Sequence, residues 1–332
     1  MQVFIWSSRK GKPENWLLRM VHWMRISRSM NIAPGPSLAC LALSFISFAC
    51  APPNLTTTAG STRIPIPHSV VSPQGGPPSV VAKRVIVIDA SNGRVLMAKN
   101  ADERCAVAST QKLMTALLVS EAGSLRDPVV IHSSDTLVEP TKLYLKTGHR
   151  YTRGQLLKAI LVRSANDASV ALARDVAGSV PRFAQQMTLR ARSLGMANSV
   201  FLNPHGLTQK GQYSTARDIA KLARYAYRQP SIRGLLTIRS YDFIHNDGKV
   251  SKLTNTNRLL KSLPYATGMK TGTTRASGKC LVASGTLHGR TVIAVVLGSS
   301  SVSVWKDSES LLRWALESPQ TIRPVVALRT GT

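Results

Sequence analysis

Strand-forming segments lie at both ends of a long stretch of this chain, and helix-forming segments lie between them. Arg84–Asp89 is rich in β-branched residues, and an Asn-Gly turn at 92–93 leads into a returning strand over 94–97. Three further strands are predicted over 270–274, 279–285 and 291–297. Because a strand must bury its apolar face against partners, these segments predict one antiparallel five-stranded sheet whose strands come from opposite ends of the chain.

The middle of the chain has the apolar spacing of amphipathic helices. Helices are predicted over 109–121, 152–163, 167–177, 181–194 and 216–228, and a closing helix over Ser303–Glu317. Helices set against an antiparallel sheet, with a helical subdomain inserted between its strands, give an α+β fold class. We therefore expect one folded domain over residues 82–318.

The segments outside this domain differ in composition. Residues 1–50 contain basic residues followed by a short apolar run over 38–46, which predicts a secretory signal and hence an exported, periplasmic or envelope-associated protein. Cys50 follows the small residue Ala49 and is a candidate site of lipid anchoring, with simple cleavage nearby as the alternative. Residues 51–81, rich in Pro, Ser, Thr and Gly, are expected to be a disordered linker, and 319–332 a short tail.

The formal net charge of +27 indicates an anionic partner. Residues 1–50 hold six basic residues and one acid, so +27 less 5 leaves +22 on the remainder. We find no nucleic-acid-binding motif, so an anionic cell-envelope surface is the expected partner and nucleic acid is not. Cys105 and Cys280 are expected to be free thiols, although an exported location would permit a disulfide. No Cys or His grouping has metal-ligand spacing, and no cofactor is expected.

Ser109 and Lys112 are three residues apart, so on a helix they share one face. A serine hydroxyl needs an adjacent base to act as a nucleophile, and a desolvated lysine near other cations can serve as that base. The spacing alone is common and equally fits a helix cap beside a solvated lysine. Two later stretches decide between these readings: Ser164-Ala165-Asn166 and Lys270-Thr271-Gly272.

These three motifs, in this order, resemble the signature of penicillin-recognising acyl-serine enzymes. From about Ala82 to Leu316 the chain resembles the serine-type D-alanyl-D-alanine carboxypeptidases, the low-molecular-mass penicillin-binding proteins of peptidase family S11. The stretches 203–207, 214–218 and 281–284 support this resemblance. It implies a β-lactamase/DD-peptidase-like fold, peptidoglycan stem peptides as substrates and β-lactam antibiotics as covalent inhibitors.

The resemblance also implies roles for the motif residues. Ser109 would be the nucleophile, Lys112 its base and Ser164 a proton relay to the leaving amine. The substrate would be bound by the remaining motif residues and by one further threonine, whose backbone N–H would join that of Ser109 in an oxyanion hole. These substrate-binding residues are Asn166, Lys270, Thr271, Gly272 and Thr273.

Three residues near the motifs have weaker claims. His205 and Asp167 are expected to be structural rather than catalytic, and Arg217 is a weaker candidate for the site. One departure from the family pattern is Val107, which stands where a proline is common.

Several activities share these motifs. The leading expectation is removal of the terminal D-Ala from a stem pentapeptide, and the alternative is a DD-endopeptidase that cleaves crosslinks. A β-lactamase is disfavoured because no glutamate-containing loop of the class A kind precedes Lys270. A catalytically idle wall-binding protein is disfavoured because all three motifs are intact.

Overall fold

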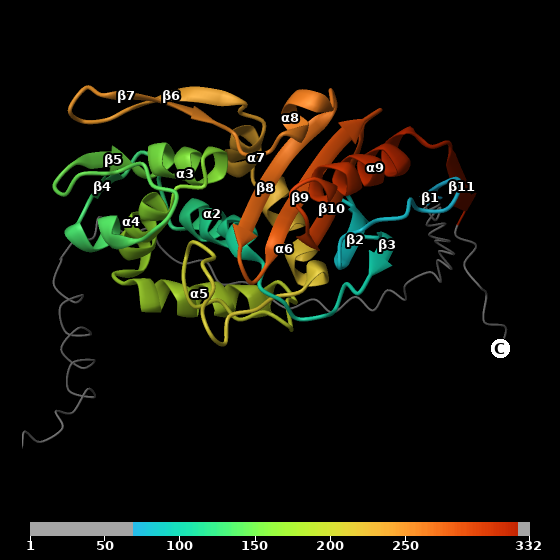
Figure 1. Ribbon diagram of the computed structural model, residues 1–332, viewed down its shortest axis with the longest axis horizontal. Coiled ribbons are helices and arrows are strands. Elements are labelled where there is room, and N and C mark those ends of the chain that lie inside the picture. The colour runs from blue at the N-terminus through green and yellow to red at the C-terminus, as the bar shows by residue number, and fades with distance from the viewer. Residues whose placement is uncertain (1–68, 325–332) are drawn as a thin grey trace, which may run out of the picture. The chain divides into compact units, whose positions relative to one another are not determined.

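The computed structural model describes residues 69–324, so the expected signal and the Cys50 site lie outside the described residues. Five antiparallel strands form the main sheet in the order β3-β2-β10-β9-β8 (Figure 1). Their bounds are β2 Arg84–Asp89, β3 Val95–Lys99, β8 Ala266–Thr274, β9 Gly278–Leu287 and β10 Arg290–Ser299. The pairing of β2 with β10 joins opposite ends of the domain, which confirms the predicted sheet.

Helices cover both faces of this sheet, and alternate side chains of β2 are buried in two different apolar clusters, one on each face. Val85 and Val87 lie in an apolar cluster with α9 (Ser303–Glu317). Ile86 and Ile88 lie in the larger cluster, which is shared with the helices of the middle of the chain. Since successive side chains of a strand point to opposite faces, a strand covered on both sides reads as a continuous apolar run.

The helical part contains α2 to α7, and α2 is central to it. Besides α9, the described helices are α2 Lys112–Glu121, α3 Arg153–Val162, α4 Asn166–Ala177, α5 Val180–Ser193, α6 Ala216–Arg228, α7 Pro230–Leu236 and α8 Leu259–Ser262. Helix α2 packs against α3, α4, α5, α6 and α7. Its residues from Lys112 to Leu117 are all buried, so the lysine of the first motif starts a helix that is enclosed on all sides. No described helix has the length and apolar character needed to cross a membrane.

Two short strands correct the expected boundaries. β1 (Ser69–Pro73) pairs antiparallel with β11 (Gln320–Pro324), so the expected disordered linker and tail are wrong at these residues. The end of the linker is also packed, because the buried Asp307 on α9 accepts hydrogen bonds from the backbone N–H groups of Val81 at 3.3 Å and Ala82 at 2.8 Å. Because the two paired segments lie at opposite ends of the chain, no local sequence pattern predicts their pairing.

Further small elements lie outside the main sheet, and the first of them falls where the β-branched run over 129–131 predicts a short strand. β4 (Pro128–Val130) pairs with β5 (Arg150–Thr152), and β6 (Ser240–Ile244) forms a hairpin with β7 (Val250–Thr254). Short 3-10 turns, η1 (Ala108–Gln111) and η2 (Ser133–Leu137), complete the described elements. The hairpin lies beside α3 (Figure 1), and Thr254 at the end of β7 lines the cleft described next.

Candidate active site

Ser109 lies on a tight turn, not on a regular helix. The turn η1 precedes α2, so the predicted helix over 109–121 begins three residues late as an α-helix. Ala108 takes a positive φ of 49°. Two glycines make room for this turn: a Cβ on Gly206 would lie 2.2 Å from the Ala108 carbonyl oxygen, and one on Gly272 would lie 3.0 Å from the Ser109 nitrogen. The turn is therefore held between two backbone segments that tolerate no side chain.

Lys112 is fully buried and reaches Ser109. Its Nζ lies 2.9 Å from Ser109 Oγ, 2.7 Å from Asn166 Oδ1 and 2.6 Å from the carbonyl oxygen of His205. Burial, and secondly the charge of Lys270, lower the pKa of Lys112 well below its ordinary value, while Asp167 opposes them. A lysine without charged partners in such surroundings favours its neutral form.

The three contacts of Lys112 fit a neutral amine. Two of them, Asn166 Oδ1 and the His205 carbonyl, are oxygens that only accept hydrogen bonds, and a neutral amine has two hydrogens to give them. The third, the hydroxyl of Ser109, can itself donate. In the structure the Ser109 hydroxyl donates to the His205 carbonyl at 3.1 Å. Once this hydroxyl turns towards Lys112, the nitrogen lone pair can face Ser109 Oγ, which is the arrangement needed to remove its proton.

Ser164 and Asn166 come from the turn into α4. Ser164 has a φ of 68° and lines the cleft. Within the described residues its hydroxyl has no hydrogen-bond partner, so it is available to a bound molecule. Asn166 is buried, accepts from Lys112 through Oδ1 and donates through Nδ2 to the Pro140 carbonyl, which fixes the orientation of its amide.

The third motif lies on β8, which is an edge strand of the sheet. Thr271 and Thr273 face the cleft, and Thr271 Oγ1 lies 2.6 Å from Thr256 Oγ1. Lys270 is buried and does not line the cleft; its Nζ donates to the Thr271 carbonyl at 3.0 Å, and burial lowers its pKa to about 7. Lys270 therefore lies away from the cleft, and its side chain is not placed to contact a substrate carboxylate directly. The two threonines line the cleft and are placed for such a contact.

A cleft of about 890 Å³ joins these residues. Among the described residues that line it there are five basic side chains and no carboxylate. The basic residues are Lys142, Arg163, Arg258, Lys261 and Lys279. This composition favours an anionic ligand.

Sequence reasoning missed the rim of this cleft. Tyr144 and Lys142 lie on a loop, and on the other side the guanidinium of Arg258 lies 5.3 Å from the ring of Trp305. Loop residues carry no periodic signal, so only the fold shows that they meet at the cleft.

The residues expected to be structural do hold other segments in place. The His205 carbonyl accepts from Ser109 Oγ at 3.1 Å, and burial lowers the pKa of the imidazole to about 3. Asp167 accepts hydrogen bonds from the N–H groups of Leu143 and Leu145, and so fixes the loop that carries Tyr144; burial raises its pKa.

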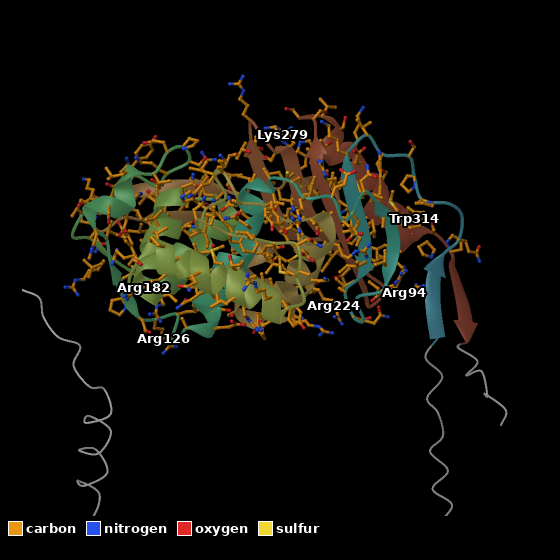
Figure 2. All side chains as sticks on the ribbon, turned by 90° about the horizontal axis from the view of Figure 1, so that it is seen from below. Arg94, Arg126, Arg182, Arg224, Lys279 and Trp314 are labelled. Carbon is orange, nitrogen blue, oxygen red and sulfur yellow. The ribbon has the colours of Figure 1, made fainter. Side chains whose placement is uncertain are left out.

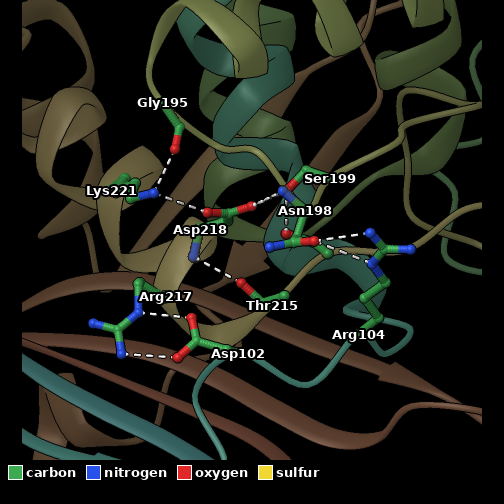
Figure 3. Close-up of polar contacts among 10 residues, drawn as sticks. Asp102, Arg104, Gly195, Asn198, Ser199, Thr215, Arg217, Asp218 and Lys221 are labelled. Carbon is green, nitrogen blue, oxygen red and sulfur yellow. Dashed lines mark hydrogen bonds and ion pairs between the residues drawn. The ribbon is translucent and has the colours of Figure 1, made fainter.

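Arg217 was a candidate for the site, and the structure places it elsewhere. Its guanidinium forms a two-pronged ion pair with Asp102, at 2.7 and 2.9 Å, and it does not line the cleft (Figure 3). The neighbouring Asp218 accepts from Ser199 and Thr215 caps α6, so this stretch anchors the helix (Figure 3). The thiols of Cys105 and Cys280 are free, as expected.

The fold and the cleft define a class: proteins with a scaffold of the penicillin-recognising type, in which a serine on a tight turn lies beside a buried lysine. The profile of peptidase family S11, D-alanyl-D-alanine carboxypeptidase, matches residues 71–301. The chain belongs to this family.

Individual relatives agree with the family match. The chain is 37% identical over 225 residues to D-alanyl-D-alanine carboxypeptidase DacF of Bacillus subtilis, covering 66% of this chain and 58% of that protein. It is 36% identical over 262 residues to DacC of Escherichia coli, covering 75% and 64% respectively. The crystal structure of the Streptomyces K15 DD-transpeptidase matches with a TM-score of 0.68 at 29% identity, covering 72% of this chain and 98% of that one. The chain thus spans less than two thirds of the length of the first two relatives.

Proposed function

We propose that this protein is a penicillin-binding D-alanyl-D-alanine carboxypeptidase that removes the terminal D-Ala from peptidoglycan stem pentapeptides. The observation that carries the proposal is the 2.9 Å contact between Ser109 Oγ and the buried Nζ of Lys112. Such a contact supplies the adjacent base that a serine nucleophile requires. The two bacterial relatives, which are named D-alanyl-D-alanine carboxypeptidases, support this choice of substrate.

In the proposed acylation, Ser109 Oγ attacks the carbonyl carbon of the penultimate D-Ala as its proton passes to Lys112 Nζ. The backbone N–H groups of Ser109 and Thr273 stabilise the oxyanion. The C–N bond then breaks, and the departing amine takes up a proton that Lys112 returns through the hydroxyl of Ser164. Water hydrolyses the resulting ester by the same proton route, which releases the shortened peptide and restores Ser109.

Binding of the substrate uses the open edge of β8. Thr271 and Thr273 offer hydroxyls to the terminal carboxylate, and the amide of Asn166 offers a partner to the substrate backbone. Gly272 lets η1 and the substrate approach the strand closely. While Lys270 is protonated, below about pH 7, its charge helps to keep Lys112 neutral. β-Lactam antibiotics would acylate Ser109 in the same way.

The cleft also bears on the alternative activities. Among the described residues, no carboxylate lines the cleft where it could activate water against a β-lactam adduct. This lining supports slow release of penicillin over β-lactamase activity. We further propose export through the segment over 38–46, because the substrate lies outside the cytoplasmic membrane.

The test compares three substrates: a pentapeptide ending in D-Ala-D-Ala, the same peptide with an amidated C-terminus, and a crosslinked muropeptide, with products identified by mass spectrometry. A charge-assisted hydrogen bond is worth about 1.5–3 kcal/mol, so amidation should lower kcat/KM by roughly tenfold to a hundredfold. Thr271→Val should lower turnover of the free acid more than that of the amide. Equal cleavage of acid and amide, with efficient cleavage of the crosslink, would favour the endopeptidase.

A further inference from the structure

A second hollow lies at the end of the sheet opposite the candidate active site. It has a volume of about 560 Å³ and lies where the β2–β3 and β9–β10 turns meet the ends of α6 and α7. On β9, Cys280 borders the first cleft and His288, just beyond the strand, borders the second hollow. The seven steps of extended strand from Cys280 to Leu287, the residue before His288, span about 23 Å. Figure 2 shows Lys279 on one side of the ribbon and Arg94 and Arg224 on the other.

Arginine dominates the lining of this hollow. Four arginines and a single carboxylate border it, which gives +4 − 1 = +3 from these side chains. The arginines are Arg94, Arg228, Arg233 and Arg290, and the carboxylate is Asp89. Asp89 already accepts from Ser91 Oγ at 2.5 Å and pairs with Arg290 at 3.3 Å, so its charge is compensated within the protein.

Arg228 and Arg233 both border the hollow, and no described carboxylate pairs with either of them. Arg228 donates to the Ser91 carbonyl at 2.6 Å, and Arg233 lies 5.9 Å from the ring of Tyr227. Neither forms an ion pair with any described residue, and both are exposed. A guanidinium held only by carbonyl or ring contacts keeps donors for an anion, and its planar fork matches an oxyanion.

Arg224, one helical turn before Arg228 on α6, holds the turn after β2 in place. It donates to the carbonyls of Ala90 at 3.0 Å and Ser91 at 2.8 Å. Burial, and then the charge of Arg228, lower the pKa of Arg224, because nearby like charges disfavour the charged form. Arginines in the last turn of a helix also interact favourably with the helix dipole. That interaction alone does not explain why Arg228 of α6 and Arg233 of α7 border the same hollow.

We propose that this hollow binds a phosphate group, either free or as the headgroup of an anionic lipid. Several guanidinium groups around one space suit an anion with oxygens on several sides, which a phosphate group provides and a carboxylate does not. This site is separate from the peptidase chemistry. Binding of phosphate here would assign a function to a part of the positive charge of the chain, namely the arginines of this hollow.

The test measures binding to the full-length chain by titration calorimetry, with inorganic phosphate and pyrophosphate as probes and acetate at equal ionic strength as the comparison. The key variant is the double substitution Arg228→Ala with Arg233→Ala. The matched control is Arg126→Ala with Arg182→Ala, which removes the same charge from exposed arginines elsewhere (Figure 2). We expect phosphate to bind more tightly than acetate, the key variant to weaken it at least about tenfold, and the control to leave it unchanged.

A second arm identifies the source of the phosphate. Binding to phosphatidylglycerol vesicles is measured relative to phosphatidylcholine vesicles, so that any contribution of the apolar segment over 38–46 cancels. Loss of this difference in the key variant alone assigns a lipid headgroup, whereas loss of phosphate binding alone assigns a soluble phosphate. Equal binding of acetate and phosphate, or equal losses in both double variants, would overturn the proposal.

Folding is checked by the rate of penicillin labelling, which the distant variants should leave unchanged. If the double variant does not fold, Arg233→Ala alone replaces it, since the only described interaction of this side chain is with the Tyr227 ring. The single variant should still weaken phosphate binding several-fold, and wild-type affinity in it would likewise refute the site.

Discussion

Gly272→Ala tests whether the position of the Ser109 turn controls acylation. The added Cβ would lie 3.0 Å from the Ser109 nitrogen, 3.0 Å from Ala108 Cβ and 3.1 Å from the Thr110 nitrogen, where ordinary contact begins at 3.4 Å. The turn must therefore move by about 0.4 Å relative to β8. Since a 1 Å displacement of reacting groups costs about a hundredfold in rate, we expect a loss of roughly fivefold to tenfold.

The assay is the second-order rate constant for labelling by fluorescent penicillin. Gly234→Ala is the matched control, because its Cβ would meet nothing within 4 Å and it lies on α7. That variant should label at the wild-type rate and be slightly more stable, since alanine in a helix is favoured over glycine by about 1 kcal/mol. Wild-type labelling by a folded Gly272→Ala protein would show that the spacing of turn and strand does not limit the reaction.

The remaining predictions concern the two buried lysines. Lys112→Arg should lower the acylation rate at least about a hundredfold, because an arginine stays protonated and cannot accept the Ser109 proton; near-normal labelling over pH 6–9 would remove Lys112 as the base. Burial lowers the pKa of Lys270 to about 7, so above that pH the unfolded chain holds a proton that the folded chain lacks. The free energy of unfolding should therefore rise with pH between about 7 and 10, by up to about 1.4 kcal/mol per pH unit for this lysine. Denaturant unfolding at several pH values should show a smaller rise in Lys270→Met, and an equal slope in both proteins would contradict the lowered pKa.

Much of the fold could be predicted because its strands and helices follow local patterns. The apolar run of Arg84–Asp89 and the helix over Ser303–Glu317 were predicted with their observed bounds. The strand pair of β1 and β11 could not be predicted, since each strand is short and its partner lies at the other end of the chain. Proline-rich composition favoured disorder there, and backbone pairing overrode it.

The candidate site shows the same division. The motifs brought Ser109, Lys112 and Asn166 together as predicted, because contacts between short motifs follow from the shared fold. The burial of Lys270 could not be predicted, since a lysine on an edge strand is usually exposed, and a rim contact such as Arg258 with Trp305 depends on loop geometry.

The central claim is that Ser109 is the nucleophile of an acyl-enzyme, and the most direct measurement is the intact mass of the protein after incubation with penicillin. The wild type should gain the mass of one penicillin, with peptide mapping placing it on Ser109. Ser109→Ala should remain folded and gain no mass. A covalent adduct on the Ser109→Ala protein, or none on the wild type, would contradict the account.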